Sequence, residues 1–400
     1  MRPPLLLVLP ALAACAGAEA RGPAVRDSAG ITIVENIQTP AGPYRVVAEE
    51  PLFDLGGSGD IHDEFNRVND AVRFSDGTVA VGDAGDQVIR VFGPDGTWLR
   101  NIGRRGGGPG EFQGLSGLYL LPGDTLATYD FQHRRLSLFL PDGTLVRETT
   151  LQPGETSFLQ PGGRFADGGL AMLIGRSFGP GAESGMVRDT STLLSYSRDG
   201  VPGDTIARFP GPETYVSVFS SGDRRGMTVS SLPFGRSTNV AVGPDRFVVA
   251  TTDSYELRIH SQTGELHRIV RRAHTLRPVT EEDVEAYINT ITSSPTMRPE
   301  TRDRLVRMNR EAPRPETMPA YGTVHLAETG DLWVSEYAVP GENRTPRTWS
   351  VFNPEGHGMG DVVLPARFTP FQIGDDRVLG RWLDEDDIHH VRIYRLDPAP

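Results

Sequence analysis

The sequence contains no lysine, so all 40 of its basic residues are arginines. The arginines are scattered along the 400 residues, and 52 acidic residues give the chain a net charge of −12. Nucleic-acid-binding domains instead gather basic residues on one stripe or face. We therefore expect no nucleic-acid partner. We also expect that positive charge does not bind this chain to a membrane surface.

Cysteine is almost absent as well, and the one cysteine, Cys15, closes a short apolar run that begins at Leu5. This run is too short to span a bilayer, and its end, LAAC, is similar to the bacterial lipobox, whose cysteine becomes lipid-modified. We expect a lipoprotein signal peptide over 1–15, lipid attachment at Cys15 and a tether over 16–29. Ordinary secretion, with cleavage after Ala20, is the alternative.

The lipobox resemblance also bears on location and chemistry. An aspartate is absent after the cysteine, where Ala16 stands, and this implies the outer membrane, facing the periplasm or the cell surface. With Cys15 lipidated, the mature chain has no thiol left for a disulfide, a zinc site or a nucleophile.

A glycine-rich stretch, GRRGGGPGEF at 103–112, has the composition of a phosphate-binding loop but not its pattern. Glu111 and Phe112 follow its last glycine, where a Walker-type loop needs a lysine and a hydroxyl. The segment after it has the pattern of a strand and a turn, not of a helix whose N-terminus could bind an anion. We expect no phosphate binding by this loop.

The stretch belongs to an internal repeat with a period of 47 residues. IGRRGGGPGEF at 102–112 repeats LGGSGDIHDEF at 55–65, and Phe92 and Phe139 each follow the final phenylalanine by 27 residues. A period near 45 with several short strands per unit is typical of β-propeller blades. The loop then connects the outer strand of one blade to the inner strand of the next.

Four weaker copies of this unit follow, so we predict an all-β, six-bladed β-propeller over 30–398. The last unit is one strand short, and residues 51–57 match the missing strand, so an N-terminal strand should close the ring. The repeat pattern is interrupted at about 277–319, where apolar residues at helical spacing predict a small insertion between blades 4 and 5. Its helices are expected near 280–291 and 299–310. This insertion either caps the channel mouth as a lid or packs beside a blade.

The Phe, Asp-Gly and GPGEF pattern resembles NHL-type repeats. From DSAGITIVEN at 27–36 to GTVHLAETGDLWVSEY at 322–337, the chain resembles uncharacterised six-bladed β-propeller lipoproteins of environmental bacteria. The resemblance implies the fold and an envelope location, and it implies no established activity. We expect a monomer that contacts the membrane only through its lipid.

Six-bladed propellers include calcium-dependent lactonases and metal-dependent lyases, whose metals bind to oxygen or imidazole ligands in the central channel. The positions six residues before each inner-strand turn are Asp70, Ser116, Pro161, Thr238, Thr323 and Thr369. Only Asp70 is a good ligand, so a divalent cation such as calcium has one weak candidate residue. We predict no other cofactor, and the sequence does not identify a catalytic residue.

Three further motifs have a functional and a structural interpretation. His389 and His390, beside the acidic run at 384–387, could ligate a metal on the rim, but a solvated hairpin tip is the favoured interpretation. His325 on an inner strand fits a packed histidine better than a ligand. GRSFG at 175–179 matches the nucleophile elbow of serine hydrolases, but no helix follows Ser177.

The sequence therefore favours a ligand-binding or protein-interaction module over an enzyme. Its partner would be an envelope protein, a peptide or a glycan, bound at the channel mouth beside the insertion. A metal-dependent hydrolase or lyase of the lactonase type is the alternative, and a purely structural member of an envelope assembly is a third possibility.

Overall fold

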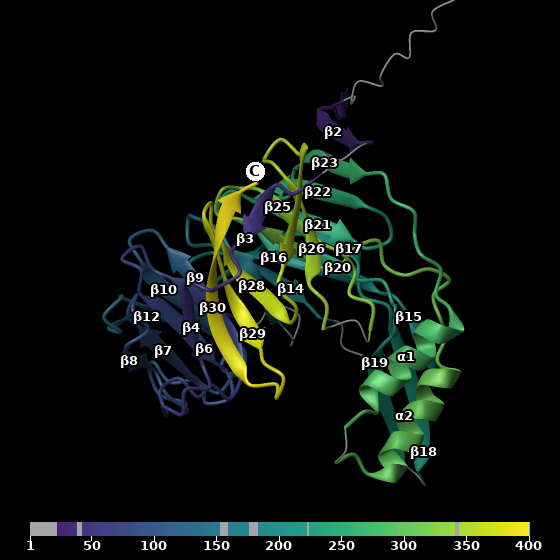
Figure 1. The fold of residues 1–400 in the computed structure, drawn as a ribbon, viewed down its shortest axis with the longest axis horizontal. Coiled ribbons are helices and arrows are strands. Elements are labelled where there is room, and N and C mark those ends of the chain that lie inside the picture. Colours follow the sequence, from purple (N-terminus) through teal and green to yellow (C-terminus); the bar gives the residue numbers. More distant parts are fainter. Residues whose placement is uncertain are drawn as a thin grey trace, which may run out of the picture.

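The computed structural model describes residues 22–37, 42–152, 159–175, 183–221, 224–294, 296–340 and 344–399. The predicted signal peptide, Cys15 and Ser177 lie outside these residues. Within them the chain is all-β, with many antiparallel sheets and two helices (Figure 1). None of the described helices is long and apolar enough to cross a membrane.

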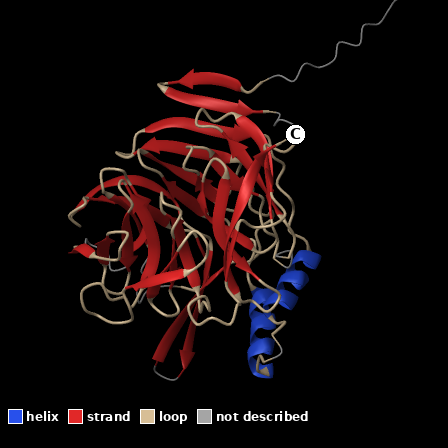
Figure 2. Ribbon diagram, turned by 60° about the vertical axis from the view of Figure 1, so that its left-hand side comes forward, coloured by secondary structure: helices blue, strands red, loops and turns tan. Residues whose placement is uncertain are grey.

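Six sheets follow one another along the chain (Figures 1 and 2). Sheet 1 contains β5 (Val68–Arg73), β6 (Val79–Asp83), β7 (Val88–Phe92) and β8 (Trp98–Ile102); sheet 2 contains β9 (Leu115–Leu121), β10 (Thr125–Asp130), β11 (Arg135–Phe139) and β12 (Leu145–Thr150). Sheet 3 contains β13 (Leu159–Arg164), β14 (Leu170–Ile174), β16 (Thr190–Tyr196) and β17 (Pro202–Pro210); sheet 4 contains β20 (Thr238–Val242), β21 (Arg246–Thr251), β22 (Glu256–Ser261) and β23 (Leu266–Arg272). Sheet 5 contains β24 (Val324–Leu326), β25 (Leu332–Ser335), β26 (Arg347–Phe352) and β27 (Gly358–Leu364); sheet 6 contains β28 (Phe368–Ile373), β29 (Arg377–Leu383) and β30 (His389–Pro398).

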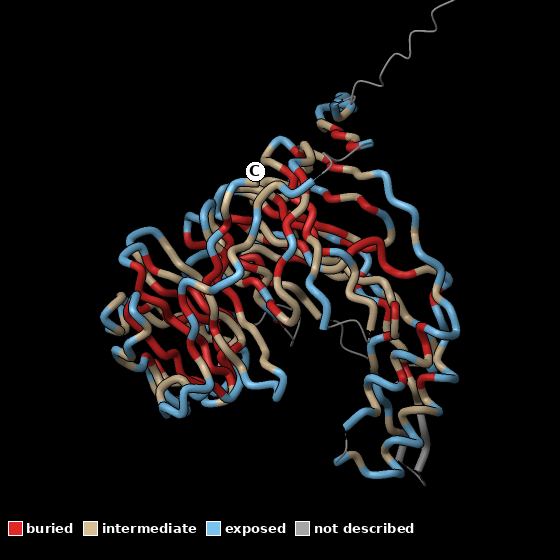
Figure 3. Tube along the Cα trace, viewed as in Figure 1, coloured by how far each residue is buried: buried red, intermediate tan, exposed pale blue. Residues whose placement is uncertain are grey.

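Side-chain packing confirms the 47-residue repeat. The rings of Phe65 and Phe92 meet edge to face with centroids 6.1 Å apart, and those of Phe112 and Phe139 do the same at 6.2 Å. Each pair lies in a separate apolar cluster, and Figure 3 shows the buried residues concentrated inside the body of the sheets, with exposed residues in the loops around it. The repeated phenylalanines therefore anchor each connecting loop to the core of the sheet beside it.

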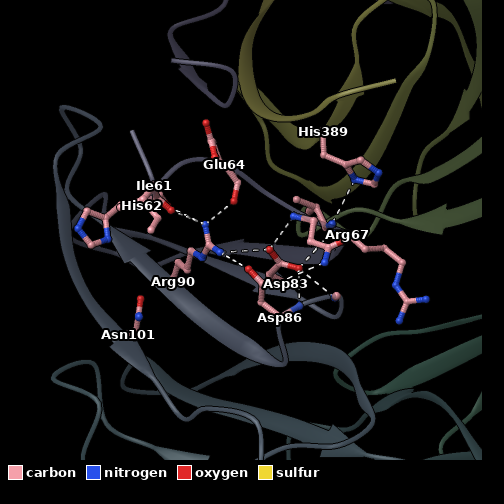
Figure 4. Close-up of polar contacts among 12 residues, drawn as sticks. Ile61, His62, Glu64, Arg67, Asp83, Asp86, Arg90, Asn101 and His389 are labelled. Carbon is pink, nitrogen blue, oxygen red and sulfur yellow. Dashed lines mark hydrogen bonds and ion pairs between the residues drawn. The ribbon is translucent and has the colours of Figure 1, made fainter. Parts of the chain in front are cut away.

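A buried aspartate at the end of the second strand holds the start of the first strand in sheets 1 and 2. Asp83 is fully buried, and its carboxylate accepts hydrogen bonds from the N–H groups of Asn66 and Arg67 at 2.9 and 3.0 Å (Figure 4). Asp130, one repeat later, accepts from Gln113 and Gly114 at 2.7 and 3.0 Å. Because these amides have no strand partner, the carboxylates accept hydrogen bonds from N–H groups that would otherwise lack an acceptor.

The glycine-rich loop at 103–112 connects β8 to β9, as predicted, and it folds on its own glutamate. The Glu111 carboxylate accepts from the N–H of Gly108 at 2.8 Å and pairs with Arg104 at 2.7 Å. Gly110 has a φ of 69°, and its N–H donates to Glu148 at 2.8 Å. Two of the loop's amides are thus bound to carboxylates of this chain, which fits a structural role.

The N-terminal strands join sheets 4 and 6. β4 (Phe53–Leu55) pairs with β30, the pairing expected for residues 51–57, and β3 (Arg45–Val47) pairs with the far end of β30. β2 (Ile31–Asn36) adds to β23 as a parallel strand, and β1 (Ala24–Ser28) pairs with β2. The expected tether at 16–29 therefore overlaps a strand at 24–28.

The helical insertion forms where predicted, between β23 and β24. α1 spans Glu281–Ile291 and α2 spans Pro299–Glu311. Thr280 and Asp283 exchange side-chain and backbone hydrogen bonds in a capping box, which stabilises the first turn of α1. Val284 and Ile288 bury the apolar face of α1 against Phe234 and Met318.

A second insertion was not predicted. β15 (Gly185–Val187), β18 (Thr214–Ser221) and β19 (Arg224–Ser231) form a separate three-stranded sheet. In an antiparallel sheet, the start of the first strand and the turn after the second strand lie at the same end. Both insertions arise at such ends, and in Figures 1 and 2 they project from the same side of the six sheets. We call this side the insertion face.

Candidate functional site: a cavity between the six first strands

A cavity of about 630 Å³ lies where the first strands of all six sheets come together. Each of these strands contributes lining residues, among them Asn69, Tyr119, Gly162, Asn239, His325 and Gln372. Clefts of several hundred cubic ångströms with a few polar groups on mostly apolar walls are the usual form of small-ligand sites. This cavity is therefore the candidate functional site.

β-Bulges bring three of the lining residues to the cavity. Asn69 in β5, Gly162 in β13 and Phe371 in β28 have no partner in the ladder to the second strand, because the register shifts by one residue at each of them. A bulge changes the direction of the side chains beside it. The bulges thus decide which residues of these strands reach the cavity.

Polar side chains join the first strands of neighbouring sheets around the cavity. Asp70 accepts a hydrogen bond from the N–H of Leu118 in β9 at 2.8 Å, and Gln372 accepts one from Arg73 in β5 at 2.7 Å. Asn239 donates to the carbonyl of Gly322, before β24, at 2.8 Å. A first strand has a free backbone edge, so these side chains satisfy groups that no strand pairs with.

Asp70 is the carboxyl group with the most unusual environment in the cavity. Burial raises its pKa to about 7, although hydrogen bonds from the N–H groups of Leu118 and Ala71 act in the opposite direction. Burial, and next the charge of Asp70, raise the pKa of Tyr119 above its usual value. Near neutral pH the Asp70 carboxyl is therefore present in both protonation states, and it can accept or donate a proton.

His325 lines the same cavity in its neutral form. Burial lowers its pKa to about 4, and its ring meets that of Trp349 edge to face at 5.5 Å.

Burial also lowers the pKa of Arg164, another residue that lines the cavity. Its Nε and Nη1 atoms are buried without a hydrogen-bond partner in the part of the chain that the structure describes. Buried donors without an acceptor are costly, so this guanidinium destabilises the fold locally.

The six positions chosen from the sequence meet the cavity only in part. Asp70 and Thr323 line it, and Asn239, Tyr119 and Gln372, which the sequence did not indicate, line it as well. Asn239 lines the cavity in place of the predicted Thr238, its neighbour in the sequence. Among the described residues, no three His, Cys, Asp or Glu side chains are grouped as a metal site.

The histidine pair at 389–390 is not a solvated hairpin tip. Both rings are half-buried, and Nδ1 of His389 accepts a hydrogen bond from the N–H of Val68 at 3.1 Å (Figure 4). His390 lies between Asp54 and Asp384, at 3.2 and 3.8 Å. The favoured interpretation from the sequence was wrong, because β30 continues to pair with β29 up to these residues.

Comparisons with known proteins give a likeness of fold alone. No family model matches the chain, and no curated protein matches it. An exported protein from Bacteroides fragilis aligns over 92% of this chain and 100% of its own, with 11% identity and a TM-score of 0.48. A member of the DUF4221 family from Bacteroides vulgatus aligns over 90% and 100%, with 10% identity and a TM-score of 0.47. Regucalcin from Agrobacterium tumefaciens, a calcium-binding protein, aligns over 90% and 97%, with 10% identity and a TM-score of 0.40. At these TM-scores, none of the three assigns a function to this chain.

Proposed function

We propose that the six sheets are the blades of one closed β-propeller with NHL-like repeats, and that this propeller is a ligand-binding or protein-interaction module. The pairing of β30 with β3 and β4 supports closure, because it joins the two ends of the chain in one sheet. The cavity lined by all six first strands is the observation that supports binding.

The module is anchored in the bacterial envelope in this proposal. The support is the LAAC motif, which places the only cysteine of the chain at the position where a lipobox has its lipidated residue. Lipid on Cys15 would hold the propeller at the outer membrane as a monomer, and its partners would be other components of the envelope. Palmitate labelling of the chain, compared with Cys15→Ala, tests this part.

The ligand is a peptide, a glycan or a segment of an envelope protein that enters the cavity. Amide, hydroxyl and carboxyl groups line it together with Leu118, Leu121 and Phe371. Such a mixture suits ligands that combine hydrogen-bonding groups with apolar surface, as sugars and peptides do. The lining extends to the turns after the first strands, at Pro122, Ala166 and Pro244, which is the end opposite the insertion face, and neither insertion contributes a residue to it.

A bulky residue in the cavity tests this proposal. Thr323 is exposed and lines the cavity, so Thr323→Trp should fill part of it, although it removes the 3.3 Å hydrogen bond between the hydroxyl groups of Thr323 and the buried Ser335. Val363→Trp is the matched control, because Val363 is 52% exposed on β27, the fourth strand of the same sheet.

Native mass spectrometry of the full chain, purified from its own envelope in mild detergent, gives the readout. We expect a retained ligand mass with the unaltered protein and with Val363→Trp, and its loss with Thr323→Trp. Equal retention by all three proteins would show that the ligand does not occupy the cavity, and the proposal would then be abandoned.

A metal-dependent hydrolase or lyase of the lactonase type is the second candidate. Asp70 favours it, since a carboxyl group with a pKa near 7 inside a cavity can act in proton transfer or bind a cation such as calcium. Elemental analysis after dialysis against metal-free buffer tests it. A stoichiometric metal that Asp70→Asn removes would support the enzyme, and no retained metal would support the binding module.

A further inference from the structure

A recess on the insertion face, outside the cavity, is lined by positively charged and amide side chains. It lies between sheets 1, 2 and 6, and its lining residues are Asn66, Arg67, Ala84, Gly85, Gln87, Arg105 and His389. The recess has a volume of about 480 Å³, and no Asp or Glu is among these residues. This is unexpected in a chain with a net charge of −12.

Two guanidinium groups of this recess are bound to consecutive carbonyl oxygens of one turn. Nη2 of Arg67 donates to the carbonyl oxygen of Ala84 at 3.1 Å, and Nη2 of Arg105 donates to that of the next residue, Gly85, at 2.6 Å. The N–H groups of Gly85 and Asp86 donate to the buried Asp83 at 2.9 and 3.1 Å, which holds this turn in place. The backbone thus sets the positions of two side chains that are themselves exposed.

Neither guanidinium has a counter-ion in the part of the chain that the structure describes. Arg67 and Arg105 form no ion pair with any described carboxylate. The two carboxylates drawn near Arg67 in Figure 4 are occupied, since Arg90 contacts Asp86 at 2.5 Å and Asp83 at 3.5 Å. Two like charges that line one recess repel each other, and an anion bound between them would relieve this repulsion. Each guanidinium keeps donor groups free for such an anion.

His389 adds a third donor to the same recess. Its Nδ1 accepts the hydrogen bond from Val68, so in the neutral ring the proton is on Nε2, which can donate. Burial and next the charge of Arg381 lower the pKa of His389, and so the ring is neutral at pH 7. A bound anion would act in the opposite direction and raise this pKa.

We propose that this recess binds a doubly charged oxyanion, a phosphate or sulfate group, between Arg67, Arg105 and His389. The two fixed guanidinium groups match the two negative charges, and charge-assisted hydrogen bonds from guanidinium to oxyanion are among the strongest in proteins. The group is part of a phosphorylated or sulfated ligand of the envelope. The recess shares no lining residue with the cavity, so this inference does not depend on what the cavity binds.

Titration of the purified full chain with inorganic phosphate tests the proposal. Side-chain spectra of isotope-labelled histidine report binding, with the His389 signal assigned through His389→Gln. We expect that signal to shift with phosphate and the His389 pKa to rise. Arg67→Gln and Arg105→Gln should each weaken phosphate binding about tenfold. Arg307→Gln on α2 should leave it unchanged, because it removes the same charge from an exposed site elsewhere.

The two arginines arise from separate loops, so Arg105→Gln still gives the test if Arg67→Gln fails to fold. Equal phosphate affinity in the unaltered chain and in both variants would overturn the site. Acetate that binds as tightly as phosphate would overturn the doubly charged ligand. Sulfate inhibition of phosphate binding is expected, since both anions present tetrahedral oxygens to the same donors.

Discussion

Asp83 offers a direct measure of how much one side chain stabilises a sheet of this protein. One of its carboxylate oxygens accepts from the N–H groups of Arg67, Gly85 and Asp86 at 3.0, 2.9 and 3.1 Å. The other accepts from Asn66 at 2.9 Å and faces Arg90. Asp83→Ala removes all of these acceptors at once from a fully buried position.

The expected loss follows from the groups left behind. An unsatisfied buried donor costs about 1–3 kcal/mol, but water can reach some of these amides because Asn66 and Arg67 are exposed. We therefore expect Asp83→Ala to lower the free energy of unfolding by about 3–5 kcal/mol, the range seen when a buried ion pair loses one partner. Asp83→Asn can keep the oxygen that accepts three of the hydrogen bonds, so its loss should be about half as large.

Urea denaturation of the full chain, followed by tryptophan fluorescence, measures these losses. Asp95→Ala is the control, since Asp95 accepts from Thr97 at 3.0 Å in an exposed Asp-Gly turn and should matter much less. If Asp83→Ala unfolds at the same urea concentration as Asp95→Ala, the buried carboxylate does not hold the start of β5, and our account of the repeat is wrong.

Asp130, the equivalent residue in sheet 2, extends this prediction to pH. Burial alone would raise its pKa, but the N–H groups of His133, Gln113 and Gly114 together lower it below the ordinary value of 3.8. A carboxyl with a lowered folded-state pKa stabilises the fold above its unfolded pKa, and this contribution is lost as the pH falls through the folded value. Asp130→Asn should therefore reduce the loss of stability below about pH 4.

Two further predictions concern the cavity and the packing of sheets 3 and 4. Because the pKa of Asp70 is raised from 3.8 to about 7, the free energy of unfolding should fall as the pH rises between these values, and urea titrations at several pH values should show this slope disappear in Asp70→Asn. Gly264 has a φ of 95°, and a Cβ there would lie 2.3 Å from the carbonyl oxygen of Ile206, whereas Gly123 has a φ of 76° with open space around it. Gly123→Ala should lower the free energy of unfolding by about 1 kcal/mol, because alanine disfavours this backbone conformation. Gly264→Ala should lower it clearly more in the same assay, since the backbone at Ile206 must also move. Equal losses in the two variants would contradict the close contact at Gly264.

The repeat was predictable because each of its parts has a local signal. Phenylalanines at equal spacing and Asp-Gly turns mark the sheets, and Gly96 and Gly143 have the positive φ that these turns require. The helices were predictable for a similar reason, since the capping box at Thr280 and the spacing of the apolar residues after it lie within one short segment.

The cavity was less predictable because it depends on register. The unpaired residues Asn69, Gly162 and Phe371 shift the strands that contain them by one position, and nothing in their sequence marks the bulges. The sheet of β15, β18 and β19 was missed for another reason. Its strands are separated by the strands of sheet 3, so no continuous segment has the pattern of a hairpin with three strands.

The pairing of β4 with β30 has a consequence for how the chain is made. Phe53 pairs with Ile393, so the partner strand of β4 is synthesised more than three hundred residues after β4 itself. Contacts so distant in sequence form slowly, because a long loop must close first. Sheets 1 to 3 pair only within their own segments and can form as they leave the ribosome. Until β30 has been synthesised, β4 has a free edge that can pair with another chain. The growing chain therefore depends on protection of β4 from such pairing until β30 is available.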